Sequence, residues 1–118
     1  MNAQSKKLLL DVVEAGRSIV ARCSGHSFAD YETDRWFRRT VEREFEIIGE
    51  ALSRLGRSDP ATAAAISELP SIVGFRNRIT HAYDAVDDAT VWCIVESRLP
   101  RLLLEIEAVL EKEGESLM

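Results

Sequence analysis

Apolar side chains recur along this chain at steps of three and four residues, the spacing that places them on one face of an α-helix. The clearest stripe predicts a helix from about residue 33 or 34 to residue 55, with Thr33 as its N-cap and Gly56 closing it. Its core-facing positions are Phe37, Val41, Phe45, Ile48, Leu52 and Leu55. This stripe predicts a long amphipathic helix packed against a hydrophobic core.

Two segments on either side of this helix also have helical patterns. Residues 4–23 predict a first helix, followed by a turn in which Gly25 suits the left-handed cap and Ser27 can start the next turn. After the long helix, Pro60 can open a short helical turn through the alanines that follow it, as far as residue 66.

The C-terminal part of the chain predicts two more helices. One starts near Pro70 and ends close to His81, and the other follows Asp87, which suits the N-cap position. Pro100 lies within the last helix and lacks a backbone donor, so we expect a kink there rather than a stop. Four amphipathic helices with short connections favour an all-α, antiparallel up-and-down bundle, with residues 1–118 forming a single domain.

The composition agrees with this fold and limits the function. A chain of 118 residues is long enough for one domain with a core and too short for two. With 46% hydrophobic and 30% charged residues, a disordered chain or a coiled-coil rod is disfavoured. The net charge of −5 removes general counterion-release affinity for nucleic acids. Any contact with RNA must therefore be local, through a few placed arginines.

Other features of the sequence exclude further classes of protein. The first residues lead into only three consecutive leucines, which form neither a signal peptide's apolar region nor a membrane span, so we expect a cytoplasmic protein. Cys23 and Cys93 lie within apolar stripes, which predicts free, buried thiols. The two histidines and two cysteines lack metal-ligand spacing, so we expect no metal and no cofactor.

Reactive side chains gather in residues 74–84, at the end of the third predicted helix and the turn after it. Arg76, Asn77, His81 and Tyr83 all lie in this short segment. Histidine gives or takes a proton near neutral pH, and arginine binds a phosphate through two parallel hydrogen bonds. Cleavage of a phosphodiester without a metal needs a base, a cation and an acid, and this segment supplies such groups.

The helical spacing constrains how these side chains can meet. Asn77 and His81 are four residues apart and share one face, whereas Arg76 lies roughly 140° around the helix from His81. On a regular helix, the side chains of Arg76 and His81 cannot both point at the same phosphate. Either the helix frays before His81, or Arg76 of one chain serves a site that a second chain completes.

The same residues resemble a known family. Residues 76–83, R-N-R-I-T-H-A-Y, fit the R-x4-H-x-Y pattern of HepT-like HEPN proteins. Other matching features follow in family order: E-I-I-G-E-A at 46–51, the lead-in at 72–75, Val86-Asp87, and the Trp92 helix with its Leu99-Pro100. The resemblance runs from the first helix to about Glu111, and the joined motifs are more specific than R-x4-H alone.

This resemblance implies a four-to-five-helix HEPN bundle that forms a homodimer through the motif-bearing helices. The implied activity is that of a metal-independent endoribonuclease toxin in a type VII-like toxin–antitoxin pair. Arg76 and His81 would be the catalytic pair and Asn77 the polar residue after the arginine. Tyr83 matches the tyrosine that a cognate MNT-type nucleotidyltransferase antitoxin adenylylates.

The sequence departs from the family pattern beside its motif. Where we expect glycine between the histidine and the tyrosine, and an aromatic residue and glycine after the tyrosine, the chain has Ala82, Asp84 and Ala85. Asp84 adds a negative charge next to a site for phosphate, which predicts weaker binding of RNA.

Several alternatives remain open at this stage. The protein could be a non-catalytic HEPN partner and substrate of a small nucleotidyltransferase, or a plain structural bundle. His81 could interact with the helix dipole, and Arg78 fits a surface charge best. Glu46 and Glu50 could act as an acid–base pair, but a solvated face or an arginine partner is favoured; Glu50 is a candidate to orient Arg76.

Overall fold

Residues 1–80 and 87–114, which the computed structural model describes, form seven helices and no strand. The helices are α1 (Ala3–Cys23), α2 (Phe28–Thr33), α3 (Arg35–Ser58), α4 (Pro60–Ala64), α5 (Leu69–Thr80), α6 (Asp88–Glu96) and α7 (Arg98–Lys112). The prediction of an all-α protein is confirmed.

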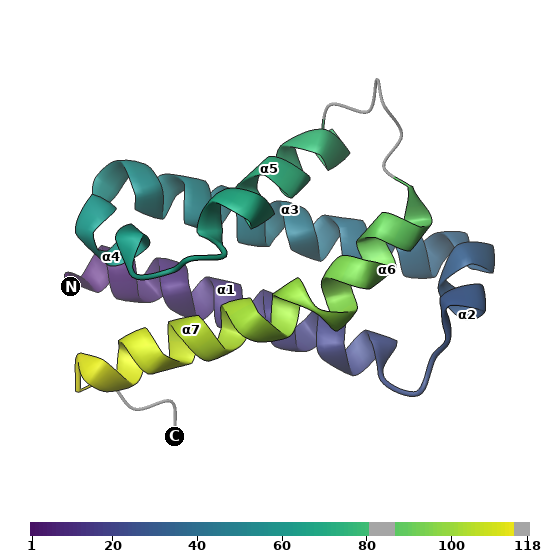
Figure 1. Ribbon diagram of the computed structural model, residues 1–118, viewed down its shortest axis with the longest axis horizontal. Coiled ribbons are helices and arrows are strands. Elements are labelled where there is room, and N and C mark those ends of the chain that lie inside the picture. Colours follow the sequence, from purple (N-terminus) through teal and green to yellow (C-terminus); the bar gives the residue numbers. More distant parts are fainter. Residues whose placement is uncertain (81–86, 115–118) are drawn as a thin grey trace.

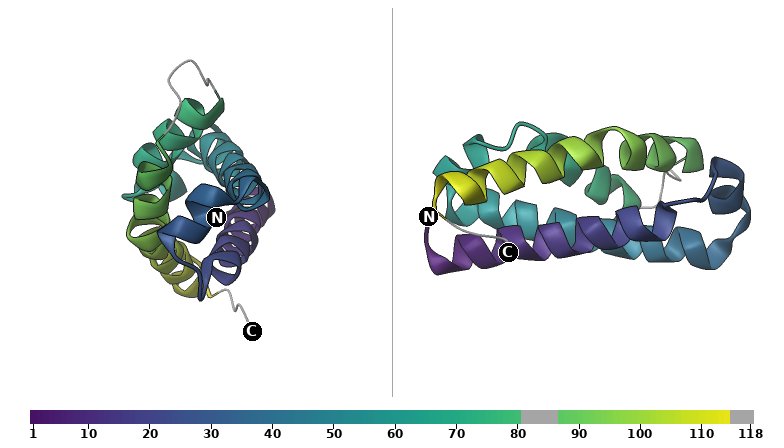
Figure 2. Two further views of the ribbon diagram at one scale, coloured as in Figure 1. Left: turned by 90° about the vertical axis from the view of Figure 1, so that its right-hand side faces the viewer. Right: turned by 90° about the horizontal axis from the view of Figure 1, so that it is seen from below.

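Helices α1, α3 and α5 alternate in direction along the long axis of the molecule, and α6 and α7 together run back in the direction of α3 (Figure 1). Helices α1 and α3 form the most extensive contact, as an antiparallel pair; α5 packs on α3, and α7 returns along α1. Seen along the long axis, the main helices surround a common centre and α2 covers one end (Figure 2). This is the predicted up-and-down bundle.

The core is built from the apolar stripes of these helices. All six stripe positions predicted for α3, from Phe37 to Leu55, are at most 1% exposed. From the other side the core receives Leu9 and Val12 of α1, together with Leu102 and Ile106 of α7, each fully buried. Burial of these side chains is what holds the bundle together.

The predicted start of α3 was close, but both residues predicted to cap the helix were wrong. Asp34, not Thr33, is the N-cap, because its carboxylate accepts hydrogen bonds from the backbone amides of Trp36 and Phe37 at 3.0 and 3.1 Å. Thr33 instead ends α2. Gly56 does not close the helix, which continues to Ser58 until Asp59 caps it and begins α4. An aspartate side chain thus caps the start of α3, and a second aspartate caps the start of the helix that follows it.

Helix α2 is an element that the apolar pattern did not predict. Ser27 starts it, as expected of that residue, through a capping box with Asp30: each side chain accepts a hydrogen bond from the other's backbone amide, at 3.2 and 2.9 Å. Tyr31 of α2 is fully buried against Phe37 and Trp92. The helix is too short to show a periodic stripe, and its single buried aromatic side chain holds it.

The last predicted helix is interrupted instead of kinked. Helix α6 ends at Glu96, Ser97 departs from helical geometry (φ −117°, ψ −61°), and α7 starts at Arg98. Pro100 thereby lies in the first turn of α7, where its missing N–H needs no partner. Asp87 caps α6 as predicted, accepting a hydrogen bond from the Ala89 amide at 3.0 Å.

The two cysteines have different surroundings. Cys23 is buried and free, as predicted, but Cys93 is exposed and free. The core face of α6 is centred on Val91 and Val95, and residue 93 lies on the other side of that helix. None of the helices in residues 1–80 and 87–114 is long and apolar enough to cross a membrane.

Candidate active site

Helix α5 carries the first half of the candidate catalytic motif and is fixed firmly to α3. Ile72 is fully buried, and the Phe75 ring packs edge-on against the Phe45 ring of α3, with the ring centres 5.1 Å apart. These two apolar contacts set the rotation of α5 about its axis. The next residue, Arg76, therefore lies along the edge of the α3–α5 interface.

Arg76 lies against α3 for most of its length. Its side chain is only 18% exposed. Glycine at position 49 of α3 leaves room for it: an ideal Cβ there would lie 2.3 Å from the Arg76 Cβ and 2.4 Å from its Cγ. The aliphatic part of Arg76 thus occupies the space that any other residue at position 49 would fill.

The guanidinium group of Arg76 reaches the next residue of α3. Its Nη2 lies 3.6 Å from Oε2 of Glu50, whose side chain is 57% exposed. The Arg76 Nε is buried and has no hydrogen-bond partner among the residues described. The group is thus held by one ion pair and retains N–H donors for a further anion.

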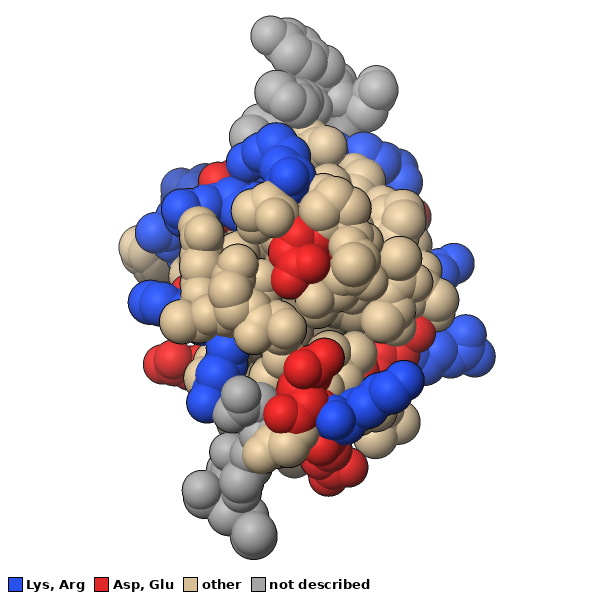
Figure 3. All heavy atoms as spheres, turned by 90° about the vertical axis from the view of Figure 1, so that its left-hand side faces the viewer, with Lys and Arg blue, Asp and Glu red and all other residues tan. Residues whose placement is uncertain are grey.

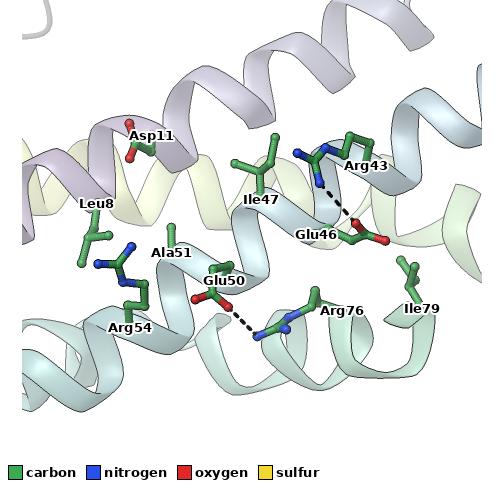
Figure 4. A pocket seen from close by; sticks show the side chains of 10 residues that line it. All are labelled: Leu8, Asp11, Arg43, Glu46, Ile47, Glu50, Ala51, Arg54, Arg76 and Ile79. Atoms are coloured by element: carbon green, nitrogen blue, oxygen red, sulfur yellow. Dashed lines mark ion pairs between the residues drawn. The ribbon is translucent and has the colours of Figure 1, made fainter. Parts of the chain in front are cut away.

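A polar cavity of about 560 Å³ lies in front of this arginine, between α1, α3 and α5 (Figure 4). Three arginines and three acidic residues line it together with four apolar side chains: Arg43, Arg54, Arg76, Asp11, Glu46, Glu50, Leu8, Ile47, Ala51 and Ile79. Glu46 pairs with Arg43 at 3.7 Å, as Glu50 pairs with Arg76. Both glutamates therefore have the arginine partners that were favoured over an acid–base pair.

The other predicted site residues are placed as follows. Asn77 is exposed and follows Arg76 on α5. Arg78 is also exposed and lines a separate hollow between α5 and α6. His81 and Tyr83 lie outside the described residues, as do Ala82, Asp84 and Ala85; α5 is helical up to Thr80, directly before His81. The structure therefore brings together Arg76 and Glu50.

Charge is mixed rather than concentrated around the bundle. At the end of the molecule shown in Figure 3, basic and acidic side chains surround a largely uncharged centre and form no continuous basic face. Among the residues described, no group of three or more His, Cys, Asp or Glu side chains could hold a metal ion. The charged groups that line the cavity at Arg76 are three arginines and three acidic residues.

Sequence reasoning missed three residues that shape this site. Gly49 appeared only as part of the E-I-I-G-E-A resemblance, and Arg43 and Arg54 were not among the predicted site residues. The spacing of 43, 46, 50 and 54 by three and four residues was a usable signal, since it places all four side chains on one face of α3.

Comparison with known proteins gives a consistent result. A family profile described as Ribonuclease HepT-like matches residues 12–109. The chain is 29% identical over 104 residues to Putative RNase MJ1380 of Methanocaldococcus jannaschii, covering 88% of this chain and 94% of that protein. It is 30% identical over 97 residues to Putative RNase TTE0752 of Caldanaerobacter subterraneus subsp. tengcongensis, covering 80% and 84%. No solved structure matches significantly.

Proposed function

Because the chain belongs to the Ribonuclease HepT-like family, we propose that it is an endoribonuclease that cleaves RNA without a metal ion. The observation that carries this proposal is the position of Arg76. Its aliphatic carbons lie against α3, and its guanidinium lies at a polar cavity and pairs with Glu50. It precedes His81 by the five positions of the R-x4-H pattern.

The proposed reaction uses these side chains in complementary roles. His81 takes the proton of a ribose 2′-hydroxyl, whose oxygen then attacks the adjacent phosphorus. The bond from phosphorus to the 5′-oxygen breaks, and that oxygen is protonated as it leaves. Arg76 stabilises the negative charge that grows on the phosphate oxygens, and Asn77 offers a neighbouring amide. The products are a 2′,3′-cyclic phosphate and a 5′-hydroxyl.

We further propose that the active form is a homodimer with the two motifs facing one cleft. Arg76 and His81 are about 140° apart around a regular helix, and α5 is regular as far as Thr80. In a symmetric dimer, Arg76 of one subunit can serve the phosphate at which His81 of the other subunit acts.

Control of the activity is assigned to Tyr83. We propose that the protein is the toxin of a toxin–antitoxin pair and that a cognate nucleotidyltransferase adds AMP to the Tyr83 hydroxyl. Tyr83 is two residues after His81. An added nucleotide phosphate there would occupy the cleft and repel the phosphate of RNA.

Single substitutions test the catalytic assignment. His81→Ala should lower the rate of RNA cleavage by about a hundredfold to ten-thousandfold, since a general acid–base group is lost. Arg76→Ala should have a comparable effect because charge stabilisation is lost. Arg78→Ala is the matched control, since it removes an exposed arginine from the same helix, and should retain most activity. Cleavage should also persist in EDTA.

The same variants separate this function from that of a non-catalytic partner. Rates would be measured on a labelled RNA with each protein's helical content checked by circular dichroism. Activity that survives both Arg76→Ala and His81→Ala, or that needs a divalent ion, contradicts the proposal. A folded wild-type protein that cleaves no RNA but is modified at Tyr83 would instead be a substrate subunit of the nucleotidyltransferase.

A further inference from the structure

Helix α3 and the candidate catalytic helix α5 approach each other closely at Gly49. An ideal Cβ at this position would lie 2.3 Å from the Cβ, 2.4 Å from the Cγ and 2.9 Å from the Nε of Arg76. Ordinary van der Waals contact begins near 3.4 Å. A side chain of any size at position 49 and Arg76 in its present place are therefore mutually exclusive.

Rotation of the Arg76 side chain cannot relieve this overlap. The nearest atom is the Arg76 Cβ, which is fixed to the backbone of α5. Relief therefore requires α5 itself to move away from α3, by 1.1 Å along this line if 2.3 Å is to become 3.4 Å. The apolar contacts of Ile72 and Phe75 with the core oppose such a movement.

Gly49 and Glu50 act on two different parts of the same side chain. The aliphatic carbons of Arg76 pack against Gly49. Glu50, the next residue of α3, pairs with the Arg76 guanidinium at 3.6 Å. An extended arginine has many rotamers, and restricting its stem reduces the entropy lost when it binds a phosphate. The close contact with Gly49 thus orients the Arg76 side chain. Because Glu50 is its single charged partner among the residues described, the guanidinium retains N–H donors for a phosphate.

We propose that Gly49 is a positioning residue of the ribonuclease site: the absence of a side chain there fixes α5 and Arg76 at the distance from α3 that catalysis needs. This inference rests on the proposed function, because it assigns Arg76 a role in cleavage. A misplacement of about 1 Å can lower a catalytic rate by on the order of a hundredfold.

Alanine substitutions at two glycines of α3 test this directly. Gly49→Ala should lower the single-turnover rate of RNA cleavage by about a hundredfold and also lower the melting temperature. Gly56→Ala is the matched control, since Gly56 lies in the same helix with nothing within 4 Å of an added Cβ. It should leave the cleavage rate unchanged and maintain or raise the melting temperature, because alanine favours helix.

A double substitution distinguishes positioning from a general loss of structure. Arg76→Gly removes the three atoms that lie nearest to an added Cβ at position 49. In that background, Gly49→Ala should cause no further loss of melting temperature. A role for Gly49 that does not involve Arg76 predicts that this loss persists.

Each result decides the proposal. It is overturned if Gly49→Ala behaves like Gly56→Ala, or if its loss of melting temperature remains undiminished in the Arg76→Gly background. Should Gly49→Ala alone fail to fold, recovery of a cooperative melting transition in the double variant supports the steric fit, and failure to recover contradicts it. If the wild-type protein cleaves no RNA, the proposed function fails, whereas the melting-temperature comparison still tests the contact between residues 49 and 76.

Discussion

At the scale of single residues, the two arginine–glutamate pairs of the cavity differ in burial. The Arg43 side chain is 72% exposed and its pair with Glu46 resembles an ordinary helix-surface contact. The Arg76 side chain is 18% exposed, with a buried Nε that lacks a partner among the residues described. Burying a guanidinium is costly unless its donors are satisfied, so an anion bound by the remaining donors of Arg76 would offset part of this cost.

Glu50→Gln tests whether the carboxylate orients Arg76. We expect the free energy of unfolding to change by less than about 1 kcal/mol, because the Glu50 side chain is 57% exposed. RNA cleavage should fall by roughly tenfold as the guanidinium loses its charged partner. Urea unfolding and single-turnover cleavage would be measured with Glu46→Gln, a glutamate of the same helix and cavity, as the control. Equal rates for the two variants would remove Glu50 from the site.

Tyr83→Phe tests the proposed control by adenylylation. The variant should keep the fold and most of the cleavage activity, because it loses only a hydroxyl group. Wild-type protein co-expressed with the cognate nucleotidyltransferase should gain the mass of one or more AMP units and lose activity, and Tyr83→Phe should escape both effects. Intact-mass spectrometry is the measurement. If Tyr83→Phe is still silenced, or if the mass gain lies on another residue, the partner acts by a different route, most simply by binding.

At the scale of elements, the apolar stripes predicted the main helices because burial of one face stabilises each of them. The apolar stripes did not predict where α3 begins and ends: Asp34 instead of Thr33 is its N-cap, and the helix continues past Gly56 to Ser58. The break at Ser97 places Pro100 in the first turn of α7, where no backbone N–H is needed. The apolar spacing does not predict this break. In the site, Glu50 was a candidate to orient Arg76, but only the packing of α5 on α3 revealed the contact between Gly49 and Arg76.

The start of α5 depends on a contact from α7. The Glu105 carboxylate accepts hydrogen bonds from the Ser67 amide at 3.0 Å, the Ser67 hydroxyl at 2.5 Å and the Glu68 amide at 3.1 Å. Glu68 in turn accepts a hydrogen bond from Arg98 of α7 at 3.2 Å. These contacts fasten α7 to the segment directly before the helix that carries Arg76.

This contact should make stability depend on pH. Burial raises the pKa of Glu105, but hydrogen bonds from Ser67 and Glu68 outweigh it and the net pKa lies below the ordinary 4.5. A lowered pKa stabilises the folded state above 4.5, and that stabilisation is lost as the pH falls through the lower, folded value. Glu105→Gln should therefore lower the free energy of unfolding by about 1–2 kcal/mol at pH 7. Urea titrations of both proteins should converge once the pH falls below the lowered pKa that Glu105 has in the folded protein; a difference that is independent of pH would contradict this account.

At the scale of the whole molecule, the described bundle measures 42 × 32 × 19 Å, with a Cα radius of gyration of 14.2 Å. Its net charge of −5 gives no general attraction to RNA, so recognition must come from local geometry. The proposed cleft between two subunits would supply that geometry, because it would double the number of motif side chains around one strand. The proposed dimer thus follows from both the charge and the angular separation of Arg76 and His81.

Mixing two inactive variants tests this shared cleft. Arg76→Ala and His81→Ala subunits, combined and allowed to exchange, should recover roughly a quarter of the wild-type rate, because half of the dimers are then mixed and one of their two sites takes an intact Arg76 from one subunit and an intact His81 from the other. Sedimentation would confirm the dimer in each sample, and unmixed variants provide the baseline. If each site used both residues of a single chain, mixed dimers would hold no complete site and no activity would return. Mixing Arg76→Ala with an Arg76→Ala/His81→Ala double variant is the matched control: no chain in that sample carries Arg76, so it must stay inactive whichever arrangement holds.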